Sequence, residues 1–261
     1  MTERSFPGSH QDTIREQFTR QAIPFSTAPL IKDEEALKLL VDRSGVGPED
    51  TVLDVACGPG IVACAFAQVC RQARGIDITP AMFERALDLR REKGLANVEF
   101  QVGDVLPLPY ANGSFSIVAC RFAFHHFIHP GAVLSEMKRV CSLGGKVILV
   151  DVMASPEPRK AAAFNQMEKL RDPSHVRALT LAEEMELFAE TGLKAPKTAF
   201  YNMTCAVEGL LERSFPAPGD EQKVRRILTD SLLDDSLGMS ARKEGNEIHV
   251  SYPIAILVGE H

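Results

Sequence analysis

Short apolar runs alternate with longer amphipathic stretches over the first part of the chain. The runs are rich in β-branched residues, and the stretches between them repeat apolar residues at helical spacing. We expect helices at residues 60–71, 80–93 and 130–141. We expect strands at residues 52–56, 74–78, 97–102, 115–120 and 146–152. Alternation of this kind with short connections predicts a parallel sheet that is covered by helices on both faces.

Two further helices are expected before the first strand. Residues 11–21 form a polar and aromatic helical stretch that is expected to end before Pro24. Asp33 is expected to cap the next helix, and Gly45 is expected to end it. The chain therefore begins with helical segments that precede the alternating part.

The regular alternation of strands and helices is interrupted after residue 152. Residues 155–180 contain three prolines and no strand pattern, which indicates an inserted segment. Beyond it we expect a helix at 181–191, a strand at 194–203, a helix at 220–234 and a closing apolar strand at 252–258. The predicted fold is α/β: a doubly wound, seven-stranded, Rossmann-like sheet with a reversed last strand and an inserted helical cap.

Composition narrows the class of protein. The 261 residues suffice for one large domain, and the apolar fraction of 45% is typical of a globular protein. The net charge of −6 argues against a nucleic-acid partner, and no apolar run is long enough for a membrane span. The polar N-terminus, with Pro7 and Gly8, lacks the apolar core of a secretion signal. The six cysteines lie in apolar runs without Cys-x-x-Cys pairs, so we expect buried thiols, no metal site and a cytoplasmic protein.

A glycine turn follows the first strand. Gly58-Pro59-Gly60 comes directly before a helix, and such a turn lets backbone N–H groups approach a nucleotide. The letters from Gly58 to Ala63 match the dinucleotide pattern Gly-x-Gly-x-x-Gly/Ala. Asp77 ends the next strand, where a carboxylate accepts hydrogen bonds from ribose hydroxyls. An NAD-dependent oxidoreductase is therefore one hypothesis.

Three other features favour a different ligand. Asp54 lies within the first strand, where a dinucleotide turn has no use for a carboxylate. Asp104 directly follows the third strand, and the polar and aromatic stretch 121–126 follows the fourth. These residues fall at the carboxyl edge of the predicted sheet, where ligands bind in such folds.

Together these motifs resemble the class I S-adenosylmethionine-dependent methyltransferases. The resemblance covers roughly residues 35–155 and is closest to the small-molecule branch, methyltransferase type 11, which includes the ubiquinone and menaquinone C-methyltransferases. It implies S-adenosylmethionine as the cofactor. It also implies an enzyme that transfers a methyl group to a small-molecule acceptor, such as a phenol, a quinone-like compound or another O, C or N nucleophile.

The resemblance implies contacts along the whole cofactor. Gly58 and Gly60 would face the methionine part, and Asp54 would help to hold it. Arg121 and Phe122 would lie near the sulfonium, whose positive charge suits an aromatic face.

At the other end of the cofactor, the same resemblance implies an adenosine site. Asp77 would accept from the ribose hydroxyls, and Ile78 and Met82 would lie against the adenine. Asp104 would accept from the adenine amino group, with Val105 beside it.

Two histidines are expected as catalytic bases, because imidazole titrates near neutral pH. His126 is expected to face the pocket near the start of the helix that frames it, although a structural role of the His125–His126 pair is an open alternative. His175 lies in the polar segment 171–177, which is similar to the cap segment of a subgroup of bacterial methyltransferases. That segment either binds an anionic or phenolic acceptor or forms a solvated loop. The residues expected to bind the acceptor are Phe18, Gln21, Arg171 and Arg177.

The chain is accordingly divided into four parts. They are an N-terminal helical lid (1–32), a cofactor-binding core (33–152), a cap segment (153–180), and a C-terminal part of the core (181–261) with a helical insertion at 204–240. Besides the oxidoreductase, a methyltransferase fold that serves as a cyclase or as a non-catalytic binding protein remains an alternative.

Overall fold

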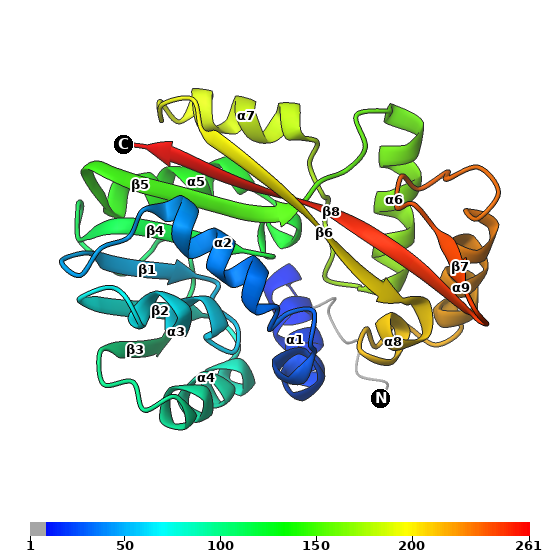
Figure 1. The fold of residues 1–261 in the computed structure, drawn as a ribbon, viewed down its shortest axis with the longest axis horizontal. Helices are drawn as coiled ribbons and strands as arrows, with labels where there is room; N and C mark the ends of the chain where they lie inside the picture. Colours follow the sequence, from blue (N-terminus) through cyan, green and yellow to red (C-terminus); the bar gives the residue numbers. More distant parts are fainter. Residues whose placement is uncertain (1–8) are drawn as a thin grey trace, which may run out of the picture.

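A mostly parallel sheet forms the centre of the molecule (Figure 1). The computed structural model describes residues 9–261. The strands in this part of the chain are β1 (Thr51–Val55), β2 (Gln72–Asp77), β3 (Val98–Val102), β4 (Phe115–Arg121), β5 (Cys141–Val152), β6 (Lys197–Ala206), β7 (Arg242–Glu244) and β8 (Glu247–Glu260). Their order is β3-β2-β1-β4-β5-β8-β6, and β7 pairs with β8.

The strand directions confirm the predicted fold class. Strands β1 to β5 run parallel to one another, and β8 runs antiparallel to both β5 and β6. The closing strand is therefore reversed, as predicted. The sheet has one strand more than predicted, because β7 forms a hairpin with the beginning of β8.

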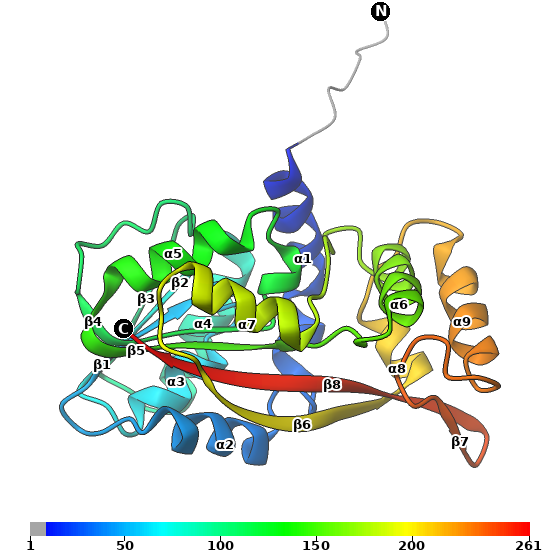
Figure 2. The ribbon, with the colours of Figure 1, turned by 90° about the horizontal axis from the view of Figure 1, so that it is seen from above.

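Helices cover both faces of the sheet (Figure 2). Neighbouring residues of a strand point to opposite faces, so Val52 packs in one core with Phe66, whereas Leu53 packs in the other with Leu134. One face carries α2 (Glu34–Ser44), α3 (Ile61–Ala67) and α4 (Pro80–Glu92). The other face carries α5 (Pro130–Val140) and α7 (Leu181–Glu190).

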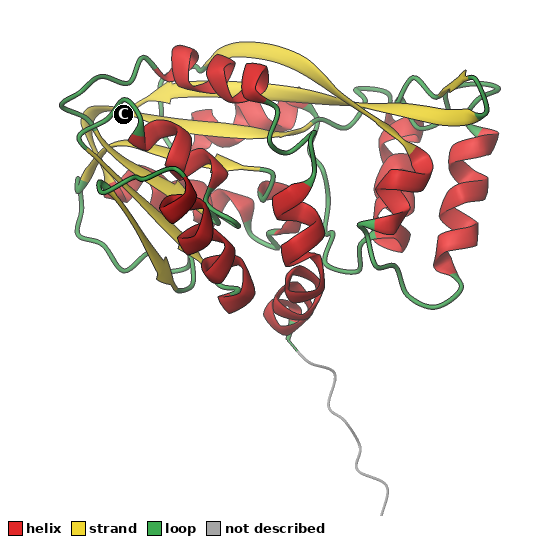
Figure 3. Ribbon diagram, turned by 60° about the horizontal axis from the view of Figure 1, so that its bottom comes forward, coloured by secondary structure: helices red, strands yellow, loops and turns green. Residues whose placement is uncertain are grey.

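The remaining helices lie beyond the carboxyl edge of the sheet. The long strands β6 and β8 extend past this edge toward α6 (Pro158–Arg171), α8 (Val207–Glu212) and α9 (Asp220–Asp230) (Figure 3). Helix α6 packs against α9. Helix α1 (His10–Thr27) lies between these helices and the sheet (Figures 1 and 3). This arrangement confirms the predicted helical cap and brings α1 over the carboxyl ends of the strands.

The predicted end of the first helix is wrong, because α1 continues through Pro24 to Thr27. Proline removes one N–H from the helical ladder, and here the last turn is supported by other contacts. The side chains of Ser26 and Thr27 donate to the carbonyl of Ile23 over 2.9 and 3.0 Å. Phe25, in the same turn, packs edge-on against Phe18. Tertiary packing thus outweighs the tendency of Pro24 to end the helix.

Other boundaries shift by a few residues. Strand β5 begins at Cys141, directly after α5, because its first residue pairs with Phe115 across an irregularity in the ladder. The predictions for residues 1–8, which are part of the expected lid and of the polar N-terminus, lie outside the described residues. From residue 9 onward, no helix has the length and apolar character needed to cross a membrane.

Candidate active site

A cavity of about 360 Å³ lies at the carboxyl ends of β1, β2 and β4 and is covered by α1. It is the larger of two cavities that matter for function. Among the ten residues expected to hold the cofactor, nine border it: Asp54, Gly58, Asp77, Ile78, Met82, Asp104, Val105, Arg121 and Phe122. The structure therefore brings together residues from four separate strand ends.

Gly60, the tenth expected residue, does not border this cavity. It begins α3 with a φ of +76°, and a Cβ atom there would come within 2.6 Å of the Phe100 ring. Its lack of a side chain thus permits the tight turn and the close packing behind it. Gly60 therefore has a structural role, and its contact with the cofactor stays a prediction.

Asp77 ties the glycine turn to β2. Its Oδ2 accepts from the N–H of Gly58 over 2.8 Å, and its Oδ1 accepts from the N–H of Thr79 over 2.8 Å. Burial raises the pKa of the Asp77 carboxyl, although these hydrogen bonds oppose the shift. Each oxygen keeps a lone pair for a further donor, such as a ribose hydroxyl.

Asp54 lies deeper, at the bottom of the same cavity wall. Its Oδ2 accepts from the N–H of Ala63 over 3.0 Å. Burial raises the pKa of the Asp54 carboxyl to about 8, and the nearby Asp77 adds to the shift. Without a ligand, Asp54 is thus largely protonated at neutral pH, and a cation placed beside it would favour its ionised form.

Arg121 has a donor without a partner. Its Nη1 donates to the carbonyl of Ile31 over 3.1 Å, and its guanidinium carbon lies 4.3 Å from the centre of the Phe122 ring. Its Nη2 is buried and has no hydrogen-bond partner among residues 9–261. An unpaired buried N–H of this kind is rare. The Tyr201 hydroxyl, which is also buried without a partner among the same residues, lies near Arg121, which opposes the rise that burial causes in the Tyr201 pKa.

Helix α1 closes the larger cavity by two polar contacts. Gln11 donates to Oδ2 of Asp104 over 2.5 Å, and Nε2 of His10 lies 2.8 Å from the carbonyl oxygen of His126. Asp104, expected to bind an adenine amino group, is thus already hydrogen-bonded to an amide of α1. No local pattern indicated this contact, because Gln11 and Asp104 are far apart in the chain.

A second cavity, of about 110 Å³, lies between α1, α6, α8 and the strands β6 and β8. Three of the residues expected to bind the acceptor border it: Phe18, Gln21 and Arg171. The two cavities share the lining residues Phe18, Phe25, Ile31, Phe122 and His126. They therefore meet at a mostly aromatic wall that contains one imidazole.

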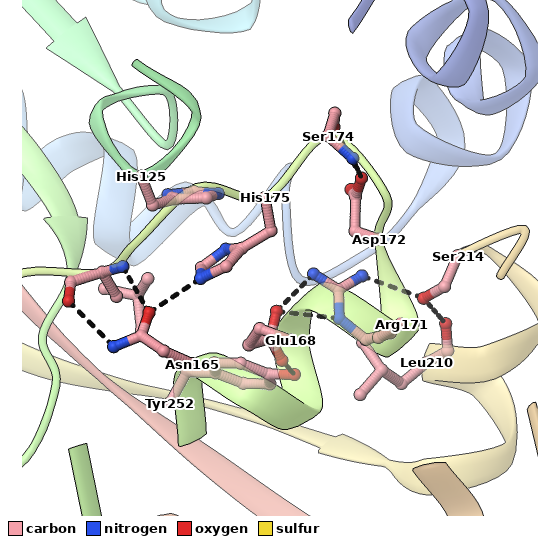
Figure 4. Close-up of polar contacts among 12 residues, drawn as sticks. His125, Asn165, Glu168, Arg171, Asp172, Ser174, His175, Leu210, Ser214 and Tyr252 are labelled. Carbon is pink, nitrogen blue, oxygen red and sulfur yellow. Dashed lines mark hydrogen bonds and ion pairs between the residues drawn. The ribbon is translucent and has the colours of Figure 1, made fainter. Parts of the chain in front are cut away.

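A buried polar network forms one side of the smaller cavity (Figure 4). Arg171 donates twice to Oε2 of Glu168, over 2.9 and 2.6 Å, and once to Oγ of Ser214 over 2.9 Å. Tyr252 donates to the other oxygen of Glu168 over 2.9 Å. Burial alone would lower the pKa of Arg171, but the Glu168 carboxylate raises it overall. The positive charge of Arg171 is thus already balanced by the carboxylate of Glu168.

His126 has the geometry of a general base. Its Nδ1 lies 3.0 Å from the carbonyl oxygen of Ser174, so the ring donates its Nδ1 proton to that oxygen. Its Nε2 has no hydrogen-bond partner in the described chain, and the ring borders both cavities. Burial and the neighbouring His125 lower the pKa of His126 to about 4. The imidazole is therefore neutral at physiological pH, with an unshared pair on Nε2.

His125 is anchored by a carboxylate that sequence reasoning missed. Its Nδ1 lies 2.6 Å from Oδ1 of Asp151, whose Oδ2 accepts from the His125 backbone N–H over 3.1 Å. Burial opposes the charged imidazolium, but Asp151 raises the pKa of His125 overall. The pair fixes the 3₁₀ turn η1 (Phe124–His126) and so positions His126. The sequence feature that could have indicated this pairing is Asp151, near the end of the fifth predicted strand.

The structure does not bring His175 and Arg177 to either cavity. The N–H groups of Val176 and Arg177 donate to the carbonyl of His125, which turns the segment away. His175 instead bonds through Nε2 to Oδ1 of Asn165 over 2.8 Å (Figure 4), and burial lowers its pKa strongly. Arg177 pairs with Glu183 on the outer surface. Neither has the contacts expected of a base or an acceptor ligand.

The fold and the larger cavity together define a Rossmann-like protein with a nucleoside-binding site at the carboxyl edge of its sheet. The model of a methyltransferase domain matches residues 53–149. An uncharacterized methyltransferase of Bacillus subtilis, YcgJ, is 32% identical over 206 residues, which cover 79% of this chain and 81% of that protein. The chain belongs to the S-adenosylmethionine-dependent methyltransferases, and S-adenosylmethionine is its cofactor.

The structural comparison agrees with the sequence. The crystal structure of YcgJ superposes with a TM-score of 0.80 at 29% identity, and the match covers 87% of this chain and 97% of that one. The ubiquinone/menaquinone C-methyltransferase of Ectopseudomonas mendocina is 28% identical over 132 residues, only 49% of this chain and 52% of that protein. The likeness to the quinone methyltransferases is thus confined to part of the chain. The family assignment replaces the hypothesis of an oxidoreductase.

Proposed function

We propose that the protein transfers a methyl group from S-adenosylmethionine, held in the larger cavity, to a small organic acceptor held in the smaller one. The observation that supports this most directly is the shared wall of the two cavities, where Phe122 and His126 border both. Methyl transfer needs the reacting atoms about 3–3.5 Å apart and in line. Two cavities that meet at one wall can provide such an approach.

The larger cavity fits the cofactor at both of its ends. Arg121 and Asp54 both border it and would offer opposite charges to the carboxylate and the ammonium of the methionine part. Asp77 would accept from the ribose, and Asp104 would accept from the adenine amino group after Gln11 withdraws. When bound, S-adenosylmethionine supplies a methyl group that is already activated by the sulfonium.

The residues of the chain position the acceptor and take its proton. His126 accepts the proton of the attacking hydroxyl or amine on Nε2, while Ser174 holds the opposite nitrogen. Its lowered pKa keeps the imidazole unprotonated at neutral pH, and the proton of the attacking atom becomes more acidic as the new bond to carbon forms. The rings of Phe18 and Phe122 border the junction and exclude water from it.

Ligand binding and turnover together test this function. We expect isothermal titration to show binding of S-adenosylhomocysteine and none of NADH. Asp77→Asn should weaken S-adenosylhomocysteine about 10- to 100-fold, because a charge-assisted hydrogen bond to the ribose is lost. The matched control is Asp88→Asn on the exposed face of α4, which should leave the affinity for S-adenosylhomocysteine unchanged.

Turnover is measured as formation of S-adenosylhomocysteine from S-adenosylmethionine with phenolic and amine acceptors. Binding without any turnover across the panel would favour the cyclase or binding-protein alternative.

The raised pKa of Asp54 predicts a pH-dependent affinity. A cationic ammonium beside Asp54 lowers the carboxyl pKa from about 8, so binding below pH 8 releases a proton. The affinity for S-adenosylhomocysteine should fall by up to about tenfold for each pH unit below 8 and level off above it. Titration at pH 7 in buffers of different ionisation enthalpy measures the released proton. Asp54→Asn should abolish that release; an unchanged release in this variant would assign it to another group.

A further inference from the structure

We propose that the smaller cavity accepts a substrate that carries a carboxylate, and that Arg213 binds this carboxylate. The inference rests on the methyl transfer proposed above and specifies the chemical class of its acceptor. It follows from the charges that border the cavity, which come from α6, α8 and the residues that follow them.

In the two carboxylates of this cavity, each oxygen already accepts at least one hydrogen bond. Glu168 accepts from Arg171 on one oxygen and from Tyr252 on the other. Asp172 accepts from Ser174 on Oδ1 and from Gln21 on Oδ2. The charge of Arg171 is balanced by Glu168. None of these groups needs a ligand to complete its hydrogen bonds.

Arg213 is the exception. It follows α8 and is half-buried, and it borders the smaller cavity together with Cys205. Burial raises the pKa of the Cys205 thiol to about 11, and the nearby Arg213 opposes this shift. Its backbone N–H donates to Leu210, but its guanidinium has no hydrogen bond or ion pair among residues 9–261. By contrast, Arg225 on α9, which is likewise partly exposed, has two carboxylate partners.

A half-buried guanidinium without a counter-ion favours an anionic ligand. Its N–H donors are free in the described part of the chain, and a planar carboxylate matches the guanidinium fork in a bidentate pair. The remaining wall is largely apolar, with Phe18, Leu30 and Ile254 among its residues. The anion should therefore be attached to an apolar body.

Size and position complete the description. An apolar cavity of about 150 Å³ takes up benzene, so a cavity of about 110 Å³ that borders a larger one suits an acceptor of about one small ring. His126 stands where the two cavities meet, whereas Arg213 borders only the smaller one. The acceptor class is thus a compact cyclic or aromatic acid, with its carboxylate toward Arg213 and its nucleophilic hydroxyl or amine toward His126.

The test compares two probes of the same shape and different charge, benzoate and benzamide. Their affinities are measured by calorimetry, with and without saturating S-adenosylhomocysteine. We expect wild-type protein to bind benzoate at least about tenfold more tightly than benzamide. Arg213→Gln should remove this preference, and Arg213→Lys should keep part of it. Arg225→Gln, which removes a partly exposed cation that does not line the cavity, is the matched control and should retain the full preference.

Three results would overturn the proposal: equal affinities for the two probes, no binding of either, or an undiminished preference in Arg213→Gln. Circular dichroism and the affinity for S-adenosylhomocysteine confirm that each variant is folded. The proposed methyl transfer fails by a different result, namely the absence of S-adenosylhomocysteine binding or formation. If the protein binds S-adenosylhomocysteine and methylates only neutral acceptors, the proposed methyl transfer stands and the proposed carboxylate-bearing acceptor is wrong.

Discussion

Replacing His126 with glutamine is expected to lower kcat by about 10²–10⁴-fold, the usual contribution of a general base. Glutamine keeps a polar side chain at the junction but has no basic nitrogen. The Kd for S-adenosylhomocysteine should change little, because His126 is expected to act on the acceptor. Turnover is measured as S-adenosylhomocysteine formed per enzyme under saturating substrates.

Two comparisons separate a base from a structural histidine. His175→Gln is the matched control, because His175 is also buried but borders neither cavity, so its kcat should stay near that of wild type. The loss in His126→Gln should also shrink for a nitrophenol acceptor assayed above its own pKa, since an ionised acceptor has no proton to give. An equal loss with ionised and protonated acceptors would make His126 a positioning residue.

Replacing Arg171 with methionine is expected to lower the free energy of unfolding by about 3–5 kcal/mol, because it leaves the carboxylate of Glu168 buried and unpaired. Methionine has a similar length, so the loss comes chiefly from the missing charge and hydrogen bonds. Urea denaturation followed by circular dichroism measures the change.

The same network provides the control variants. Combining Arg171→Met with Glu168→Gln should restore a large part of the lost stability, because no unpaired charge remains. Arg225→Met removes an exposed ion pair on α9 and should cost no more than about 1 kcal/mol. If Arg171→Met costs as little as Arg225→Met, the buried pair does not stabilise this fold.

The larger cavity was largely predictable from the sequence, for a physical reason. Asp54, Asp77 and Asp104 each lie at or near the end of a strand, and parallel strands bring such ends to one edge. Local patterns therefore fixed where these carboxylates would lie. Gly60 shows the limit of such reasoning, since only the packed structure reveals that Phe100 fills the space a side chain would need.

The smaller cavity was predicted far less well. Its walls come from α1, α6, α8, β6 and β8, which only tertiary packing brings together. Arg171 and Arg177 had the same appearance in the sequence, yet one is buried against Glu168 and the other lies outside. No local signal distinguished them. The pairing of Asp151 with His125 and the unpaired guanidinium of Arg213 were likewise visible only in three dimensions.

Helix α1 has a kinetic consequence. One end of this helix bonds to Asp104 in the larger cavity, and Gln21, nearer its other end, bonds to Asp172 beside the smaller one. A displacement of the helix that opened the adenosine site would therefore also loosen the wall around the acceptor. We expect the order in which the two compounds bind, and the inhibition by the spent cofactor, to depend on this eighteen-residue helix.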